Sequence, residues 1–255
     1  MRSFGDVRVE WGNDFVASVE IDRGPDNYFD RKLIASLAEA LEAMDAEHDV
    51  RAIVLCSAGK HFCAGANFRS RVLETESGRH LYDEAARLFR TRKPLVAAIQ
   101  GGAIGGGLGL ALVADFRVAA PEARFAANFA RLGFHHGFGL SVTLPALIGE
   151  QRALELLYTG RRVPGEEALR LGLCDRLAPL AEVRGYARSL AGEIAASGPL
   201  AVEAIRTTQR GDLADRVVRA MARERAEQDR LRDTDDFHEG IAAMAARRAP
   251  SFQRR

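Results

Sequence analysis

A run of glycines after a short apolar segment constrains this chain more than any other part of its sequence. Leu95–Ile99 is an apolar run that predicts a buried strand, and it ends at a glycine pair, 101–102. A glycine triplet, 105–107, then opens a helix expected over Leu108–Ala114. Glycine lets a ligand approach the backbone, and the first turn of a helix has free N–H groups. The segment therefore predicts a place to hold a negatively charged oxygen.

Two phosphate-binding patterns do not fit this segment. A P-loop would require Lys followed by Ser or Thr after its second glycine, and Leu108 and Gly109 stand there instead. A dinucleotide fingerprint beginning at Gly105 would require glycine at position 110, which is Leu110. A strand–glycine–helix corner without either motif can also be a tight packing turn. Taken alone, the segment leaves an oxyanion site and a packing corner both open.

A second loop of the same kind lies upstream. Arg51–Ser57 predicts a buried strand, and Gly-Lys-His-Phe-Cys-Ala-Gly-Ala-Asn follows it at 59–67. With Pro94–Gly107, this loop resembles the two signatures of the crotonase (enoyl-CoA hydratase/isomerase) superfamily, G-K-x-F-x-A-G-A-D and P-x-I-A-A-V-x-G-x-A-x-G-G-G. Segments at 156–175 and 237–252 resemble later family motifs in the same order. The chain is therefore identified as a member of this superfamily.

The resemblance implies an α/β fold, a crotonase-type spiral of ββα units. It implies a core with the acyl-CoA site over residues 1–190 and a C-terminal helical region, 191–255, that packs trimers. The sequence itself predicts a helix over Asp30–Glu47 with Asp30 as its N-cap, and helices from about residue 182 with breaks at 197–199 and near 211. The expected strands are 7–11, 15–21, 52–56, 95–99 and 116–119.

Composition excludes several classes of partner. The formal net charge is +1, which shows no global bias toward nucleic acid. No apolar run is long enough to span a bilayer, and no signal-peptide pattern follows Met1. The three cysteines, Cys56, Cys63 and Cys174, lack metal-ligand spacing and are expected to be reduced. We therefore expect a cytoplasmic protein with no metal, no membrane partner and no nucleic-acid partner.

The resemblance implies a specific chemistry for the two glycine-containing loops. An acyl thioester reacts by gathering negative charge on its carbonyl oxygen, and two backbone N–H donors stabilise that charge. Carried over from the family, the donors would be the amides of Ala66 and Gly106. No further cofactor is required, since coenzyme A arrives as part of the substrate. The family assembles as a homotrimer or as a hexamer, a dimer of trimers.

The two glutamates that family hydratases use as acid and base are absent. The first would stand at Gly109, and the second would stand in the pair Asn128-Phe129. Glycine and phenylalanine cannot transfer a proton, and each acid–base group contributes about 100- to 10,000-fold. An ordinary hydratase is therefore not expected from these residues. Asn128 could donate a hydrogen bond near the lost carboxylate or cap a turn.

A pair of histidines occupies the place where the family has x-P-G. His135, His136 and Gly137 precede a helix expected over Phe138–Ile148. A helix N-terminus disfavours the imidazolium, and neutral imidazole can accept a proton or orient a water. His136, or else His135, is the candidate base, with the Gly137 amide holding the water as in the family. Either histidine could equally be a core or surface residue.

The remaining candidates line the acyl pocket or hold coenzyme A by carry-over from the family. An acid from the segment 71–90, such as Glu74, Glu76, Asp83 or Glu84, could reach the pocket, although a charged helix face is the better explanation of these residues. His61 is expected to be exposed. The pocket candidates are Gly109, Asn128, Phe129, Phe134 and Phe138, and the coenzyme A candidates are Arg23, Asn27, Ala64, Asn67 and Arg247.

Three functions remain open at this point. The first is an acyl-CoA enzyme that runs C–C cleavage, hydrolysis or decarboxylation rather than ordinary hydration. The second is a hydratase or isomerase with relocated acid and base groups. The third is a non-catalytic CoA-binding subunit, which a pocket plugged by Phe129, Phe134 and Phe138 would favour. The same aromatics, if they line an open pocket, suggest a bulky or cyclic acyl group.

Overall fold

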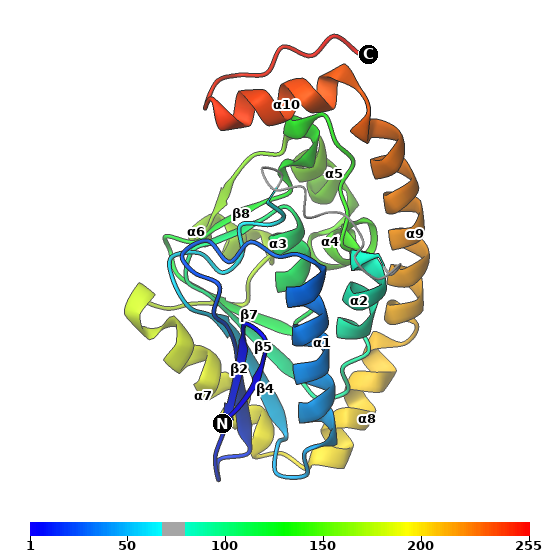
Figure 1. Ribbon diagram of the computed structural model, residues 1–255. Coiled ribbons are helices and arrows are strands. Elements are labelled where there is room, and N and C mark those ends of the chain that lie inside the picture. The colour runs from blue at the N-terminus through cyan, green and yellow to red at the C-terminus, as the bar shows by residue number, and fades with distance from the viewer. Residues whose placement is uncertain (68–79) are drawn as a thin grey trace.

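The computed structural model describes residues 1–67 and 80–255, and in these residues two sheets are surrounded by helices (Figure 1). The main sheet has the strand order β1-β2-β3-β4-β5-β7-β10, and the small sheet has the order β6-β8-β9. The strands are β1 (Arg2–Phe4), β2 (Val7–Trp11), β3 (Val16–Ile21), β4 (Ala52–Ser57), β5 (Leu95–Ile99), β6 (Gly102–Ile104), β7 (Phe116–Ala119), β8 (Arg124–Ala126), β9 (Val163–Pro164) and β10 (Arg176–Leu177).

The helices lie between and outside these strands. The first group is α1 (Arg31–Ala46), α2 (Leu81–Leu88), α3 (Gly106–Ala111), the 3-10 turn η1 (Asn128–Leu132), α4 (Leu140–Ile148), α5 (Glu150–Thr159) and α6 (Gly165–Leu171). The second group is the 3-10 turn η2 (Leu180–Glu182), α7 (Val183–Ala195), α8 (Pro199–Arg210), α9 (Leu213–Arg232) and α10 (Asp235–Ala245).

From β5 to β8, successive strands of the chain alternate between the two sheets. The chain leaves β5 in the main sheet and enters β6 in the small sheet, and it repeats this step from β7 to β8. The β5–β6 unit and the β7–β8 unit lie side by side, because β5 pairs with β7 and β6 pairs with β8, both in parallel. The expected α/β spiral is confirmed. The glycine pair at 101–102 lies at the corner between β5 and β6.

The centre of the main sheet is covered on both faces, which explains why β4 and β5 are buried along their whole length. Along β4, Ile53 and Leu55 pack in the cluster that includes the buried face of α1. The alternate residues Val54 and Cys56 pack in a second cluster with Ala187 of α7. Burial raises the pKa of the Cys56 thiol to about 11, and none of the three cysteines forms a disulfide. They are buried thiols, as expected.

Element boundaries follow local backbone chemistry. Asp30 is the N-cap of α1, since its carboxylate accepts a hydrogen bond of 2.8 Å from the Leu33 amide. The helix expected from Phe138 begins only at Leu140, because Phe138 and Gly139 have positive φ angles of 61° and 76°. A right-handed helix cannot include that conformation. The helix expected over 108–114 is instead Gly106–Ala111, so the glycines form its first turn.

The C-terminal helices wrap one side and one end of the molecule. In Figure 1, α9 runs along the side beside α2 and α4, and α10 crosses the end above η1. The boundary expected at residue 190 falls inside α7, which packs against β4 and β5, and the division into two regions stays a prediction. Within residues 1–67 and 80–255, no helix is long and apolar enough to cross a membrane.

Candidate active site

The two glycine-containing loops, residues 59–67 and 101–107, are in direct backbone contact. A Cβ added to Gly65 would lie 2.7 Å from the Ile104 carbonyl oxygen and 3.8 Å from the Gly106 nitrogen. A Cβ added to Gly107 would lie 2.1 Å from the Cys63 carbonyl oxygen. Only glycine fits at such distances. We call these two segments the glycine loops.

Two backbone N–H groups are left over where the glycine loops meet. The Gly106 amide lies in the first turn of α3, where helix geometry provides no acceptor. The amides of Leu108 and Gly109 donate to the Gly105 carbonyl. Within residues 1–67 and 80–255, the Gly106 and Ala66 N–H groups donate to no acceptor. Both amides are therefore free to bind an oxygen.

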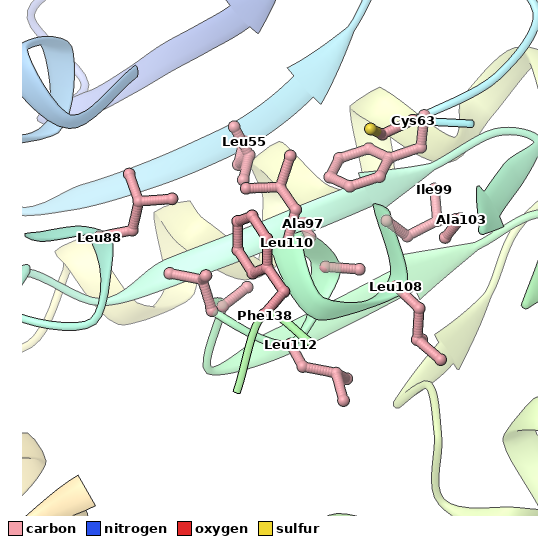
Figure 2. Packing of buried hydrophobic residues seen from close by; sticks show 14 of the residues in the cluster. Leu55, Cys63, Leu88, Ala97, Ile99, Ala103, Leu108, Leu110, Leu112 and Phe138 are labelled. Atoms are coloured by element: carbon pink, nitrogen blue, oxygen red, sulfur yellow. The ribbon is translucent and has the colours of Figure 1, made fainter. Parts of the chain in front are cut away.

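The space beside Gly109 is filled by an aromatic ring. A Cβ added to Gly109 would lie 2.6 Å from the Cβ of Phe138, whose side chain is 1% exposed. The Phe138 ring lies 5.5 Å from the ring of Phe29, which also covers Gly106. Figure 2 shows Phe138 among the apolar side chains around α3, including Leu110. A glutamate at position 109 has no room in this packing.

The other candidate pocket residues divide into two groups. Asn128 and Phe129 lie beside Gly105, since a Cβ added there would be 3.3 Å from Asn128 Oδ1 and 3.6 Å from the Phe129 ring. The ring of Phe134 packs on Phe237 of α10 at 4.6 Å between centroids. The structure thus brings Phe129 and Phe138 to the glycine triplet and places Phe134 against a C-terminal helix.

The histidine loop, residues 133–139, connects η1 to α4. The rings of His135 and His136 stack at 4.2 Å between centroids. His136 Nε2 lies 2.9 Å from the Ser141 hydroxyl, and His135 Nδ1 lies 2.7 Å from the His136 carbonyl oxygen. Burial, followed by the charge of His135, lowers the pKa of His136 to about 4. The expected neutral imidazole is therefore present, and burial is the main cause.

Glu224 of α9 holds the end of the histidine loop. Its carboxylate is fully buried and accepts hydrogen bonds from the Gly139 amide at 2.9 Å and from the Ser141 amide at 3.0 Å. It also accepts one from the Ser141 hydroxyl at 2.7 Å. Sequence reasoning missed this residue. The available signal was a charged residue on the buried face of α9, which also carries Val217 and Met221.

A tyrosine and a glutamine hold the other end of the histidine loop. The Tyr82 hydroxyl donates to Gln228 Oε1 at 2.8 Å, and Gln228 Nε2 donates to the His135 carbonyl at 3.0 Å. A Cβ added to Gly137 would strike this pair, at 1.8 Å from the Tyr82 oxygen. The loop is therefore fixed by α2 and α9 together.

Arg23 and Asn27, two coenzyme A candidates, have protein partners. The Arg23 guanidinium forms ion pairs with Asp6 at 2.7 Å and with Asp30 at 2.8 Å. A phosphate would have to compete with both carboxylates. The buried Asn27 side chain donates to the Ala58 and His61 carbonyls at 2.6 and 2.7 Å. Its side chain ties two loops together rather than facing a ligand.

The remaining coenzyme A candidates lie at three places. The Ala64 amide donates to the Asp26 carbonyl at 2.9 Å, Asn67 is partly buried at the end of the first glycine loop, and Arg247 is exposed beyond α10. His61 was expected to be exposed, and this is wrong. Its ring is partly buried and accepts a hydrogen bond of 3.0 Å from the Gly102 amide, so it pins the second glycine loop.

The described acids of the segment 71–90 are occupied by structural contacts. Asp83 accepts a hydrogen bond from the His80 amide in the capping box of α2. Glu84 is buried and pairs with Arg31 and Arg87. Glu74 and Glu76 lie outside the described residues. Among residues 1–67 and 80–255, no cluster of three His, Cys, Asp or Glu side chains could hold a metal ion.

Comparisons with known proteins agree with this architecture. The sequence model described as Enoyl-CoA hydratase/isomerase matches residues 12–255. A putative enoyl-CoA hydratase of Thermus thermophilus is 37% identical over 96% of this chain and 100% of that protein. The (E)-benzylidenesuccinyl-CoA hydratase of Thauera aromatica is 33% identical over 97% of this chain and 98% of that protein.

Solved structures give the same result for the fold. The crystal structure of an enoyl-CoA hydratase/isomerase from Pseudoalteromonas atlantica T6c has a TM-score of 0.89 and 30% sequence identity, covering 97% of this chain and 100% of that one. Sequence and structure therefore agree over nearly the whole length, glycine loops included, and the chain belongs to the enoyl-CoA hydratase/isomerase family.

Proposed function

We propose that this protein processes an acyl-CoA by holding the thioester oxygen between the amides of Ala66 and Gly106. The observation that carries this proposal is the contact of the two glycine loops, which leaves two N–H groups without acceptors among the described residues. Such donors stabilise an enolate or a tetrahedral oxyanion, and each is worth about 3 kcal/mol in the transition state. They belong to the backbone, so side-chain changes leave them in place.

The same proposal assigns proton transfer to His136. Gly109 and Phe129 have no group that can transfer a proton. The neutral imidazole of His136 can accept and return one. In cleavage of a β-keto thioester, a water loses its proton to His136 and adds to the β-carbonyl. The Cα–Cβ bond then breaks, the enolate oxygen rests on the two amides, and the proton returns to Cα. Thioester hydrolysis and decarboxylation also need only one such group.

Hydration is the second candidate, because a specific comparison favours it. The Thermus and Thauera relatives are both named as hydratases, and each aligns over nearly its full length. In this reading, His136 takes a proton from water as the oxygen adds to Cβ and returns it to Cα. A bulky or ring-bearing acyl group stays part of the proposal in either case, although Phe29, Phe129 and Phe138 are themselves buried beside the glycine triplet.

The assembly is a separate part of the proposal. Leu200 and Ile205 of α8 are 82% and 62% exposed, which is unusual for a helix whose sequence is amphipathic. Covering them in a homotrimer, or in a hexamer of two trimers, fits the family expectation. Light scattering in solution tests this: a monomer at micromolar concentration would contradict it.

A turnover screen by mass spectrometry tests the function. The panel contains enoyl-, malonyl-type, β-keto- and aromatic acyl-CoAs, and wild type is compared with His136→Ala and with His48→Ala, whose side chain is fully exposed. Release of CO₂ or free CoA, or C–C cleavage, that is lost only in His136→Ala supports the lead proposal. Gain of one water on an enoyl-CoA supports hydration instead. Silence with CoA still bound contradicts both and leaves a non-catalytic CoA-binding subunit.

A further inference from the structure

The buried Glu224 carboxylate is satisfied entirely by groups at the start of α4. The N-cap of α4 is Gly139, which has no side chain to cap the helix. Glu224 reaches the same N–H groups from α9, 85 residues along the chain. An anion beside a helix N-terminus is stabilised by the free N–H groups and by the helix dipole. One carboxylate oxygen is bonded to the Gly139 amide, and the other is bonded to the Ser141 amide and hydroxyl.

This arrangement fixes the direction of the hydrogen bond between Ser141 and Glu224. Both carboxylate oxygens already receive backbone N–H donors, so in its 2.7 Å contact with Glu224 the Ser141 hydroxyl is the donor. A serine hydroxyl has a single proton. Toward His136 Nε2, at 2.9 Å, the Ser141 oxygen can therefore only accept.

The tautomer of His136 follows from that direction. Nε2 must carry the proton that Ser141 accepts, so in the neutral ring Nδ1 holds the free lone pair. Because burial keeps the ring neutral, with a pKa of about 4, the tautomer decides which nitrogen can take up a proton. His135 is fixed in the opposite sense, since its Nδ1 faces the His136 carbonyl oxygen, which only accepts.

We propose that Glu224 and Ser141 are positioning residues that hold His136 in its Nε2–H tautomer and present Nδ1 as the proton-accepting atom. The hydrogen-bond chain stands on its own geometry, whereas its use in catalysis rests on the proposed function of His136. The chain Glu224–Ser141–His136 links α9, α4 and the histidine loop. Glu224 lies 83 residues from Ser141 in the sequence, and neither of these two residues was a sequence candidate.

The test is a long-range ¹H–¹⁵N NMR spectrum of the full chain labelled with ¹⁵N-histidine, with the His136 signals assigned from their loss in His136→Ala. Wild type is expected to show a protonated Nε2 and an unprotonated Nδ1 at His136. Ser141→Ala should give a mixture of tautomers, and Ser141→Thr, which keeps the hydroxyl, should restore one. Thr143→Val is the matched control, because it removes an α4 hydroxyl that bonds the Gly139 carbonyl instead.

Kinetics on the substrate found in the turnover screen supply the second readout. Ser141→Ala should lower kcat by about 10- to 100-fold with KM unchanged, since the misplaced proton affects only the chemical step. Ser141→Thr should recover most of this loss, and Thr143→Val should retain wild-type kcat.

The outcomes separate the two levels of the argument. An Nδ1–H tautomer at His136 in wild type, or an unchanged tautomer in Ser141→Ala, overturns the positioning role itself. If Ser141→Ala changes the His136 tautomer but leaves kcat unchanged, the use of that tautomer in catalysis is overturned. Full turnover in His136→Ala overturns the proposed function, whatever the tautomer is.

Discussion

The glycine loops and the histidine loop lie close to the same helix, α3, yet they relate to the family pattern in opposite ways. Within residues 59–67 and 101–107, the glycine loops match every fixed position of the two family signatures except Asn67, where the first signature has aspartate. The histidine loop has His135 and His136 in place of the family residues, and Phe138 has filled the space beside Gly109. The first region supplies backbone donors, whereas the second supplies side chains.

The difference shows which parts of a site can change independently. A backbone donor depends only on the path of the chain, and that path is fixed here by glycines in contact with carbonyl oxygens. A carboxylate that transfers protons depends on one residue and is lost in one substitution. Under the proposed function, we therefore expect oxyanion stabilisation to persist where the proton-transfer group is replaced.

The largest effect is expected at the contact of the glycine loops. Gly107→Ala would place a methyl group 2.1 Å from the Cys63 carbonyl oxygen, and both partners are backbone. We expect the free energy of unfolding to fall by about 3 kcal/mol or more, measured by denaturant titration. Gly185→Ala in α7 is the control, since nothing lies within 4 Å of an added Cβ there. Equal stability of the two variants would show that the backbone contact between the glycine loops does not require glycine at position 107.

The histidine loop should make stability depend on pH. The folded pKa of His136 is about 4 against an ordinary value of 6.5. Between these values the unfolded chain binds more protons than the folded chain, so stability is full above pH 6.5 and falls as pH drops toward 4. The loss is about 3 kcal/mol.

Denaturant midpoints measured across that pH window test the prediction, with His136→Gln as the variant that cannot titrate. The His135 ring stacks on the His136 ring. The other titratable groups near the histidine loop are Glu224 on α9, which bonds Ser141, Glu227 on α9, which interacts with the charge of His135, and Tyr82 on α2, which bonds Gln228. A His136→Gln profile as steep as that of wild type would assign the titration to one of these instead.

The pairing of Gly109 with Phe138 predicts a coupling between two substitutions. Gly109→Glu alone should destabilise the protein by about 2 kcal/mol, because the new side chain meets Phe138. In a Phe138→Gly background the clash disappears, so the double variant should lose less than the sum by about 1–2 kcal/mol. Additive losses in a denaturant-based double-mutant cycle would show that Phe138 does not occupy the space of the missing glutamate.

The smallest effect is expected for the Tyr82–Gln228 hydrogen bond, which holds one end of the histidine loop. Tyr82→Phe removes the hydroxyl that donates a hydrogen bond to Gln228. We expect a loss of about 1–2 kcal/mol, measured by thermal unfolding. Tyr158→Phe is the control, because that side chain is 74% exposed. A Tyr82→Phe variant as stable as this control would mean that α2 does not hold the loop.

Local signals could be predicted from the sequence, and long-range pairings could not. The strands Leu95–Ile99 and Phe116–Ala119 and the cap at Asp30 were predicted correctly, because apolar runs and capping residues act within a few positions. The late start of α4 was missed, because the positive φ of Phe138 is set by its packing on Gly109.

The same limit applies to the site. The glycine loops could be predicted because their motifs encode the close backbone approach directly. The role of Glu224 could not be predicted, since it depends on α9 lying beside α4. The ion pairs of the Arg23 guanidinium with Asp6 and Asp30 could likewise not be predicted, because they depend on how the chain folds.

The central claim is that the two amides of the glycine loops and the imidazole of His136 together form an enolate from an acyl-CoA. Deuterium incorporation at Cα of a saturated aromatic acyl-CoA, incubated with the protein in D₂O and followed by mass spectrometry, measures that step directly. Wild type should exchange the Cα protons, and His136→Ala should slow the exchange by about 100-fold or more. Exchange at the wild-type rate in His136→Ala, or no exchange in wild type, would contradict the claim.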